Sequence, residues 1–153
     1  MDRHKTREVR VGKLLVGGNQ PVWVQSLTTT KTSNVEATKT EIRAMIDAGC
    51  EIVRVAVFDG ADAAALGAVK KFMGDVPLVS DIHFNYKFAL TAIEQGVDKV
   101  RLNPGNISGL AGEFGKEGQE RVRIVAEAAK KKGISMRVGV NSGSVEKDLL
   151  EKH

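Results

Sequence analysis

The feature that most constrains the fold of this chain is an eleven-residue segment that occurs twice. Residues 45–55 and 92–102 share a helical ending, a glycine and a β-branched run with a central arginine, and they lie 47 residues apart. Such a repeat predicts two copies of a helix–turn–strand unit. A (β/α)8 barrel uses roughly 250 residues for eight such units, so this spacing corresponds to about two of them.

The rest of the chain alternates in the same way between short apolar runs and helical patterns. We expect strands at 22–26, 51–57, 76–80, 99–103 and 134–140. Helices are expected at 34–48, 60–73, 86–95 and 118–132, and a further one begins at Ser144. This order predicts parallel strands joined by right-handed crossovers, which is the α/β class. Five strands make roughly half of a (β/α)8 TIM barrel.

A β-hairpin is expected before the barrel, at residues 9–18, where apolar alternation surrounds a Gly-Lys turn. No shift in composition marks a second domain, so residues 1–153 are interpreted as part of one barrel domain. A doubly wound open sheet is the alternative. Its phosphate-binding turn requires G-x-G-x-x-G after the first strand, and residues 25–30 lack that pattern.

Composition narrows the function classes. The net charge of +4 is modest and the basic residues are spread along the chain, which favours small anions over nucleic acid as partners. The charged residues 1–7 do not resemble a signal peptide, and no stretch approaches the ~20 apolar residues of a membrane span. These observations predict a cytoplasmic protein without a membrane partner. Cys50, the single cysteine, is expected to be a small buried residue and cannot alone hold zinc or an iron–sulfur cluster.

Three arginines occur in the same phase of three expected strands. Arg54, Arg101 and Arg137 alternate with valines and a leucine that fit the helix layer, so the arginines point into the barrel. Dry burial of unpaired guanidinium groups costs several kcal/mol for each ion unless an anion is near. Arginine binds phosphate oxygens in a bidentate manner, which favours a diphosphate at the barrel mouth. Alternatively, the arginines pair with acidic barrel residues or lie on a solvated face.

Other polar residues follow the expected strands. Asp81 and His83 share a face just beyond the third strand, where they either bind a metal or transfer protons, or form a structural pair. Asn103 opens an Asn-Pro-Gly-Asn segment and a glycine-rich loop at 108–118. Asn141 leads to a helix N-terminus with Lys147 in its first turn, which is suited to an oxyanion or is a plain helix cap.

Taken together, these motifs resemble one enzyme family. The segments are Val-Gln-Ser-Leu-Thr at 24–28, Ile-Val-Arg-Val at 52–55, Ser-Asp-Ile-His-Phe at 80–84, Val-Arg-Leu-Asn-Pro-Gly-Asn at 100–106 and the run at 137–149. In order and spacing they are similar to 4-hydroxy-3-methylbut-2-enyl diphosphate synthase of the non-mevalonate pathway of isoprenoid (terpenoid) biosynthesis. The resemblance extends from about Thr6 to the last residue. It implies that residues 1–153 are the N-terminal portion of a TIM-barrel substrate-binding domain, that is, the N-terminal half of a (β/α)8 TIM barrel with a preceding β-hairpin.

The resemblance implies a specific chemistry. Members of the family are oxidoreductases that open 2-C-methyl-D-erythritol 2,4-cyclodiphosphate reductively, with two electrons from flavodoxin or ferredoxin. They are homodimers in which a [4Fe-4S] cluster, held by three cysteines and a glutamate in a second domain, closes over the partner's barrel. By resemblance, the diphosphate would be bound by Arg54, Arg101, Arg137 and Asn141. Asp81, His83 and Asn103 would lie nearer the carbon skeleton.

Two features of the chain depart from the family pattern. The 108–118 loop is longer than is common there, and the second barrel half and the iron–sulfur domain with its ligands are absent, so this fragment is expected to be inactive alone. One alternative is a non-redox phosphate-binding module, or a half-barrel that dimerises. Another is a non-redox barrel enzyme for phosphorylated sugars. An aldolase of this kind would need a lysine that faces into the barrel and forms a Schiff base with the substrate. Lys99 faces inward but lies at the wrong end of its strand.

Overall fold

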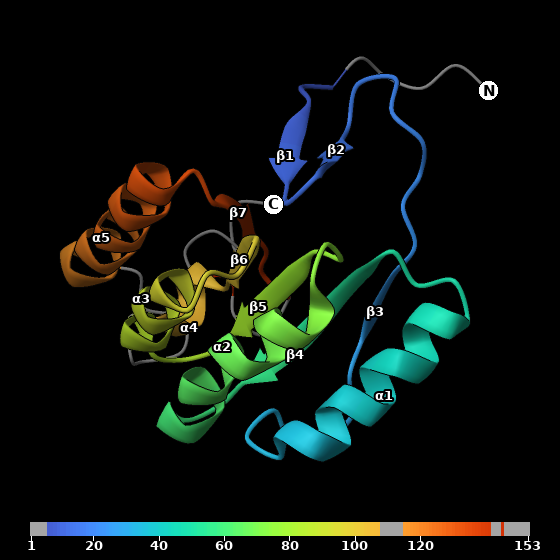
Figure 1. The fold of residues 1–153 in the computed structure, drawn as a ribbon. Helices are drawn as coiled ribbons and strands as arrows, with labels where there is room; N and C mark the ends of the chain where they lie inside the picture. Colours follow the sequence, from blue (N-terminus) through green and yellow to red (C-terminus); the bar gives the residue numbers. More distant parts are fainter. Residues whose placement is uncertain (1–5, 108–114, 142–144, 146–153) are drawn as a thin grey trace.

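The computed structural model describes residues 6–107, 115–141 and 145. Its strands are β1 (Val9–Val11), β2 (Leu14–Val16), β3 (Gln25–Leu27), β4 (Ile52–Val57), β5 (Leu78–Ile82), β6 (Lys99–Leu102) and β7 (Ser135–Val138). Its helices are α1 (Val35–Asp47), α2 (Gly60–Met73), α3 (Tyr86–Glu94), α4 (Pro104–Ile107) and α5 (Lys116–Lys132). Figure 1 shows the helices arranged around a twisted sheet, with the hairpin at one end.

The main sheet has five parallel strands in the order β3-β4-β5-β6-β7. Each strand therefore lies beside the one that precedes it in the chain, as in a barrel. A doubly wound sheet would reverse direction at a switch point within this order. The expected α/β class and partial barrel are confirmed.

The core lies between the sheet and the helices. Val53, Val55 and Val57 of β4 are almost fully buried and pack with Leu66 of α2 and Ile42 of α1. Side chains of a strand alternate between faces, so this outer face is apolar while the intervening residues form an inner, concave face. The outer face is less buried at the edge strand β7. Val138 and Val140, which were expected to lie under the helix layer, are 60% and 53% exposed. No helix among the described residues covers them.

Strand β5 differs from its expected position. It runs from Leu78 to Ile82, so Asp81 lies inside the strand and not beyond its end, as the sequence had suggested. Pro77 has no N–H, and pairing with β4 starts at Leu78 opposite Val53. The strand therefore begins two residues later than expected, and it also ends two residues later. The segment after β6 also differs, because it forms the short helix α4 where a loop was expected.

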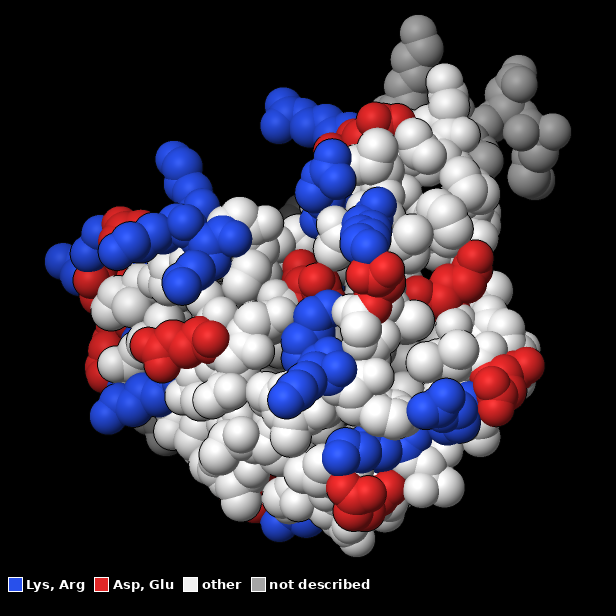
Figure 2. All heavy atoms as spheres, viewed as in Figure 1, with Lys and Arg blue, Asp and Glu red and all other residues white. Residues whose placement is uncertain are grey.

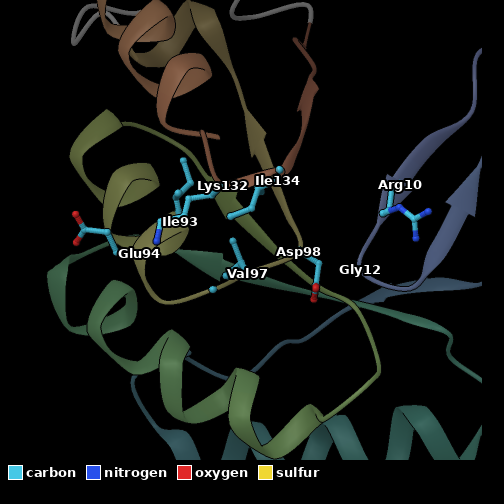
Figure 3. A pocket seen from close by; sticks show the side chains of 10 residues that line it. Arg10, Gly12, Ile93, Glu94, Val97, Asp98, Lys132 and Ile134 are labelled. Carbon is cyan, nitrogen blue, oxygen red and sulfur yellow. The ribbon is translucent and has the colours of Figure 1, made fainter. Parts of the chain in front are cut away.

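The expected hairpin is present and covers the N-terminal ends of the strands. β1 and β2 pair antiparallel around Gly12, whose φ of 57° suits glycine in a tight turn. Val11 is 1% exposed, and the Trp23 indole Nε1 donates to the Leu15 carbonyl at 2.7 Å. A cavity of about 290 Å³ lies at this end, lined by hairpin, α3 and α5 residues that include Arg10 and Lys132 (Figure 3). None of the predicted site residues lines it.

Candidate anion-binding site at the carboxyl ends of the strands

The inner face of the sheet gathers the three arginines predicted to point inward. Asp81 of β5 is opposite Arg101 of β6, and Arg101 is opposite Arg137 of β7. Arg54 of β4 has the same phase, beside Leu27 of β3. Because residues opposite each other in a parallel ladder project to the same side, the predicted phase is confirmed.

Asp81 is the centre of this arrangement. Its carboxylate is 1% exposed and accepts hydrogen bonds from Arg54 Nε at 2.9 Å, from Arg54 Nη2, and from Arg101 Nη1 at 3.0 Å. Arg101 Nη2 also donates to the Gly139 carbonyl at 3.3 Å. The alternative that the arginines pair with an acidic barrel residue therefore holds for two of the three, because Asp81 binds both Arg54 and Arg101. These bonds fix the guanidinium planes of two arginines on β4 and β6, the strands on either side of β5.

The negative charge of a single carboxylate does not neutralise the positive charges on the inner face. Asp81 is the only acidic side chain that β3 to β7 place there, whereas Arg54, Lys99, Arg101 and Arg137 are basic. Arg137 is exposed and makes no ion pair with any described residue. The outer surface is different, since acidic and basic side chains are interspersed on the face in Figure 2. The excess of positive charge at the strand ends favours a multiply charged anion.

His83 lies at the edge of this cluster. Its Nε2 is 3.7 Å from Asp81 Oδ2, and its ring stacks on Phe58 with centroids 5.0 Å apart. His83 Nδ1 is buried and has no hydrogen-bond partner within the described part of the chain. Asp81 and the Phe58 ring thus orient the imidazole beside the arginines. No group of three or more His, Cys, Asp or Glu residues suited to a metal ion occurs among the residues described.

The remaining predicted residues have different surroundings. Asn103 directly follows β6 and is 1% exposed, and its carbonyl accepts from the amides of Asn106 and Ile107, the last two residues of α4. Asn141 follows β7 and is exposed. Lys147, residues 108–114 of the glycine-rich loop and the helix expected from Ser144 lie outside the described residues. The structure therefore brings Arg54, Asp81, His83 and Arg101 into one contact network, with Arg137 beside it.

A threonine-rich wall at the same end of the sheet was missed in the sequence. Leu27 at the end of β3 and residues 28–32, which follow it, line a cavity of about 410 Å³ together with Ala56 and Phe58. The Glu41 carboxylate of α1 accepts from the Thr29 and Thr30 amides at 2.8 and 2.9 Å and from the Thr29 hydroxyl at 2.8 Å. The run of threonines directly after a strand was the only sequence signal for this wall.

The ionisation of Glu41 makes the stability of this threonine-rich wall depend on pH. Burial acts to raise its pKa, but hydrogen bonds from Thr29 and Thr30 outweigh burial and lower the pKa from 4.5 to about 2. Because the folded-state pKa is the lower one, its stabilising contribution is complete above about pH 4.5 and is lost as the pH falls toward 2.

We expect Glu41→Gln to lower the free energy of unfolding by about 1 kcal/mol at neutral pH, a value reduced for partial solvent exposure. The difference from wild type should shrink as the pH falls from 4.5 to 2, because the wild-type carboxylate is then protonated. Urea unfolding across this range measures it. Glu36→Gln, which removes an exposed carboxylate paired only with Lys39, is the matched control. An equal deficit at every pH would contradict the assignment.

No helix in the described part of the chain is long and apolar enough to cross a membrane.

Comparison with known proteins gives a consistent set of relatives. The 4-hydroxy-3-methylbut-2-en-1-yl diphosphate synthase (flavodoxin) of Shouchella clausii is 55% identical over 151 residues, which are 99% of this chain and 38% of that protein. The protein of the same name from Ruminiclostridium cellulolyticum is 48% identical over 150 residues, 98% of this chain and 40% of its own length.

The similarity to solved structures is weaker. A mandelate racemase/muconate lactonizing family protein from Azoarcus sp. EbN1 aligns over 76% of this chain and 43% of its own, with a TM-score of 0.44 and 18% identity, which supports no further inference. The chain spans 38% of the length of the Shouchella relative. The model of the GcpE TIM-barrel domain matches residues 6–153. Since that match includes all the described site residues, this chain belongs to the GcpE TIM-barrel domain family.

Proposed function

We propose that this chain forms the diphosphate-binding barrel half of a 4-hydroxy-3-methylbut-2-enyl diphosphate synthase, an oxidoreductase of isoprenoid biosynthesis by the non-mevalonate route. One observation carries the proposal: three inward arginines gather beside the single carboxylate of Asp81 on the inner face, toward the strand ends where barrels bind their ligands. The names of the relatives support it.

The substrate in this proposal is 2-C-methyl-D-erythritol 2,4-cyclodiphosphate. Its two phosphoryl charges suit the positive excess, and the guanidinium groups of Arg54, Arg101 and Arg137 offer paired N–H donors to its oxygens. Asn141 and Lys147 would add contacts to the diphosphate. The reductive ring opening then gives 4-hydroxy-3-methylbut-2-enyl diphosphate, with flavodoxin as the electron donor that the relatives' names favour and ferredoxin as the other.

The residues of this chain bind and orient the substrate in the proposed reaction. Asp81 holds two arginines in fixed planes before the ligand arrives, which reduces the ordering needed on binding. His83, stacked on Phe58, and the buried Asn103 would face the carbon skeleton from the same strand ends.

The iron–sulfur cluster of the full-length family does not fit the residues described here. Cys50 is buried, with its thiol near the Ile52 carbonyl at 3.1 Å, and no described group of His, Cys, Asp or Glu residues gathers around it. The cluster would supply electrons from a part of the protein beyond this chain, in a homodimer located in the cytoplasm. No redox step is assigned to residues 1–153.

A chimera tests the proposed function. The N-terminal 38% of the Shouchella clausii relative is replaced by this chain, and conversion of the cyclodiphosphate with reduced flavodoxin is measured. We expect turnover, and its loss in an Arg101→Met chimera. A folded, cluster-loaded chimera that binds the cyclodiphosphate but does not convert it would favour a non-redox anion-binding module instead.

A further inference from the structure

Lys99 is a basic residue of the inner face that the proposed function leaves without a role. It lies at the start of β6, two residues before Arg101, and shares the inner face with that arginine. Its Nζ lies 3.5 Å from Oε1 of Gln25 on β3, although β4 and β5 separate the two strands. Such a contact spans the concave side of the curled sheet. Lys99 therefore lies on the inner face level with Arg54 in the ladder and two residues before the level of Arg101 and Arg137.

The surroundings of this ammonium group contain little to neutralise it. The groups facing it are Gln25 on β3, Arg54 on β4, Asp81 on β5, Arg101 on β6, and Ser135 and Arg137 on β7. Asp81, the one acid among them, is already bonded to Arg54 and Arg101. Lys99 itself makes no ion pair with a described residue. It is thus a partly buried cation among cations, with an amide oxygen as its neighbour.

We propose that Lys99 is the proton-coupled cation of this site: a multiply charged anion bound above it draws a proton onto Nζ, so that affinity for the anion falls as the pH rises. The inference rests on the proposed function, because the anion is taken to be the cyclic diphosphate. It adds a residue and a mode of pH regulation to that site.

Electrostatics support this coupling. Burial, followed by repulsion from Arg137 and then Arg54, lowers the pKa of Lys99 from 10.5. An anion placed above the ammonium acts in the opposite direction and raises the pKa again. Between the pKa of the free protein and that of the complex, binding takes up a proton, and the dissociation constant rises by up to about tenfold per pH unit.

Lys99→Met provides a variant that separates folding from binding. Because the folded protein loses this lysine proton at a lower pH than the unfolded chain, the charged lysine disfavours the folded state, and stability rises with pH up to about 10.5. Removal of the charge with retention of the side-chain length should therefore leave the melting temperature unchanged or higher. The same variant should bind the anion about tenfold more weakly at neutral pH.

The experiment is calorimetric titration of the 153-residue chain with the cyclodiphosphate from about pH 7.5 to about pH 10, where histidines are neutral. Both phosphoryl groups of this ligand are fully ionised over that range, so changes in affinity report on the protein. Two buffers of different ionisation enthalpy at each pH give the number of protons taken up. Lys71→Met, which removes an exposed lysine of α2, is the control for a change in net charge.

The results separate the two proposals. We expect wild type and Lys71→Met to take up a proton and to weaken as the pH rises, and Lys99→Met to lose most of both effects. Binding by wild type with the same proton uptake in Lys99→Met would overturn the role of Lys99 and leave the proposed function intact. Absence of binding by folded wild-type chain would contradict the anion site itself and this inference with it.

Discussion

Replacement of Asp81 by asparagine is expected to lower the free energy of unfolding by about 3 kcal/mol, because it leaves two inward arginines without their shared counter-charge. The carboxylate is 1% exposed, and the side chains of Arg54 and Arg101 are 24% and 11% exposed, so water compensates only in part. Urea unfolding of both proteins gives the difference. The cyclodiphosphate should stabilise the variant more than wild type, because it replaces the missing negative charge.

Asp75→Asn is the matched control for this change. Asp75 also pairs with a basic residue, Lys13, but both side chains are more than two-thirds exposed, so the expected loss of stability is much smaller than that of the Asp81 variant. An Asp81 variant no less stable than the Asp75 variant would show that the buried carboxylate does not hold the arginines together.

Replacement of Arg137 by alanine is expected to weaken ligand binding while it leaves the stability of the fold almost unchanged. Arg137 is exposed and has no ion-pair partner among the described residues, so the free energy of unfolding should change by less than about 0.5 kcal/mol. The loss of one charge-assisted contact to the diphosphate should raise the dissociation constant roughly 30-fold, or about 2 kcal/mol. Calorimetric titration and thermal unfolding measure the two quantities.

Arg123→Ala controls for the removal of any arginine. Its side chain is 59% exposed on the helix α5 and pairs with Glu120 and Glu127 of the same helix. Its dissociation constant should equal that of wild type at the same salt concentration. Equal weakening in both variants would indicate a general charge effect and would count against a contact by Arg137.

The two arginine environments show what the sequence can predict. The phase of Arg54, Arg101 and Arg137 followed from strand alternation alone, because a period of two fixes the face of each residue once a strand is recognised. The parallel order of the strands followed from the helices between them. Both predictions depend on local patterns, and the structure confirms both.

The pairing of Asp81 was outside the reach of local patterns. It depends on the register between β4, β5 and β6, and the expected end of β5 was two residues too early. The Glu41 clamp on Thr29 and Thr30 is likewise a tertiary contact between a helix and a strand end, which no periodicity signals. Sequence therefore located the cations of the site, and only the three-dimensional structure showed how acids position them.

A nuclear magnetic resonance titration of the ¹⁵N-labelled chain with the cyclodiphosphate, followed at the arginine Nε–H signals, tests the anion site most directly. The structure predicts saturable shifts of Arg54, Arg101 and Arg137 with one common dissociation constant, and unchanged signals from the exposed Arg43 and Arg123. Shifts confined to the exposed arginines, or no shifts in a folded chain, would contradict a diphosphate site on the inner face of the sheet.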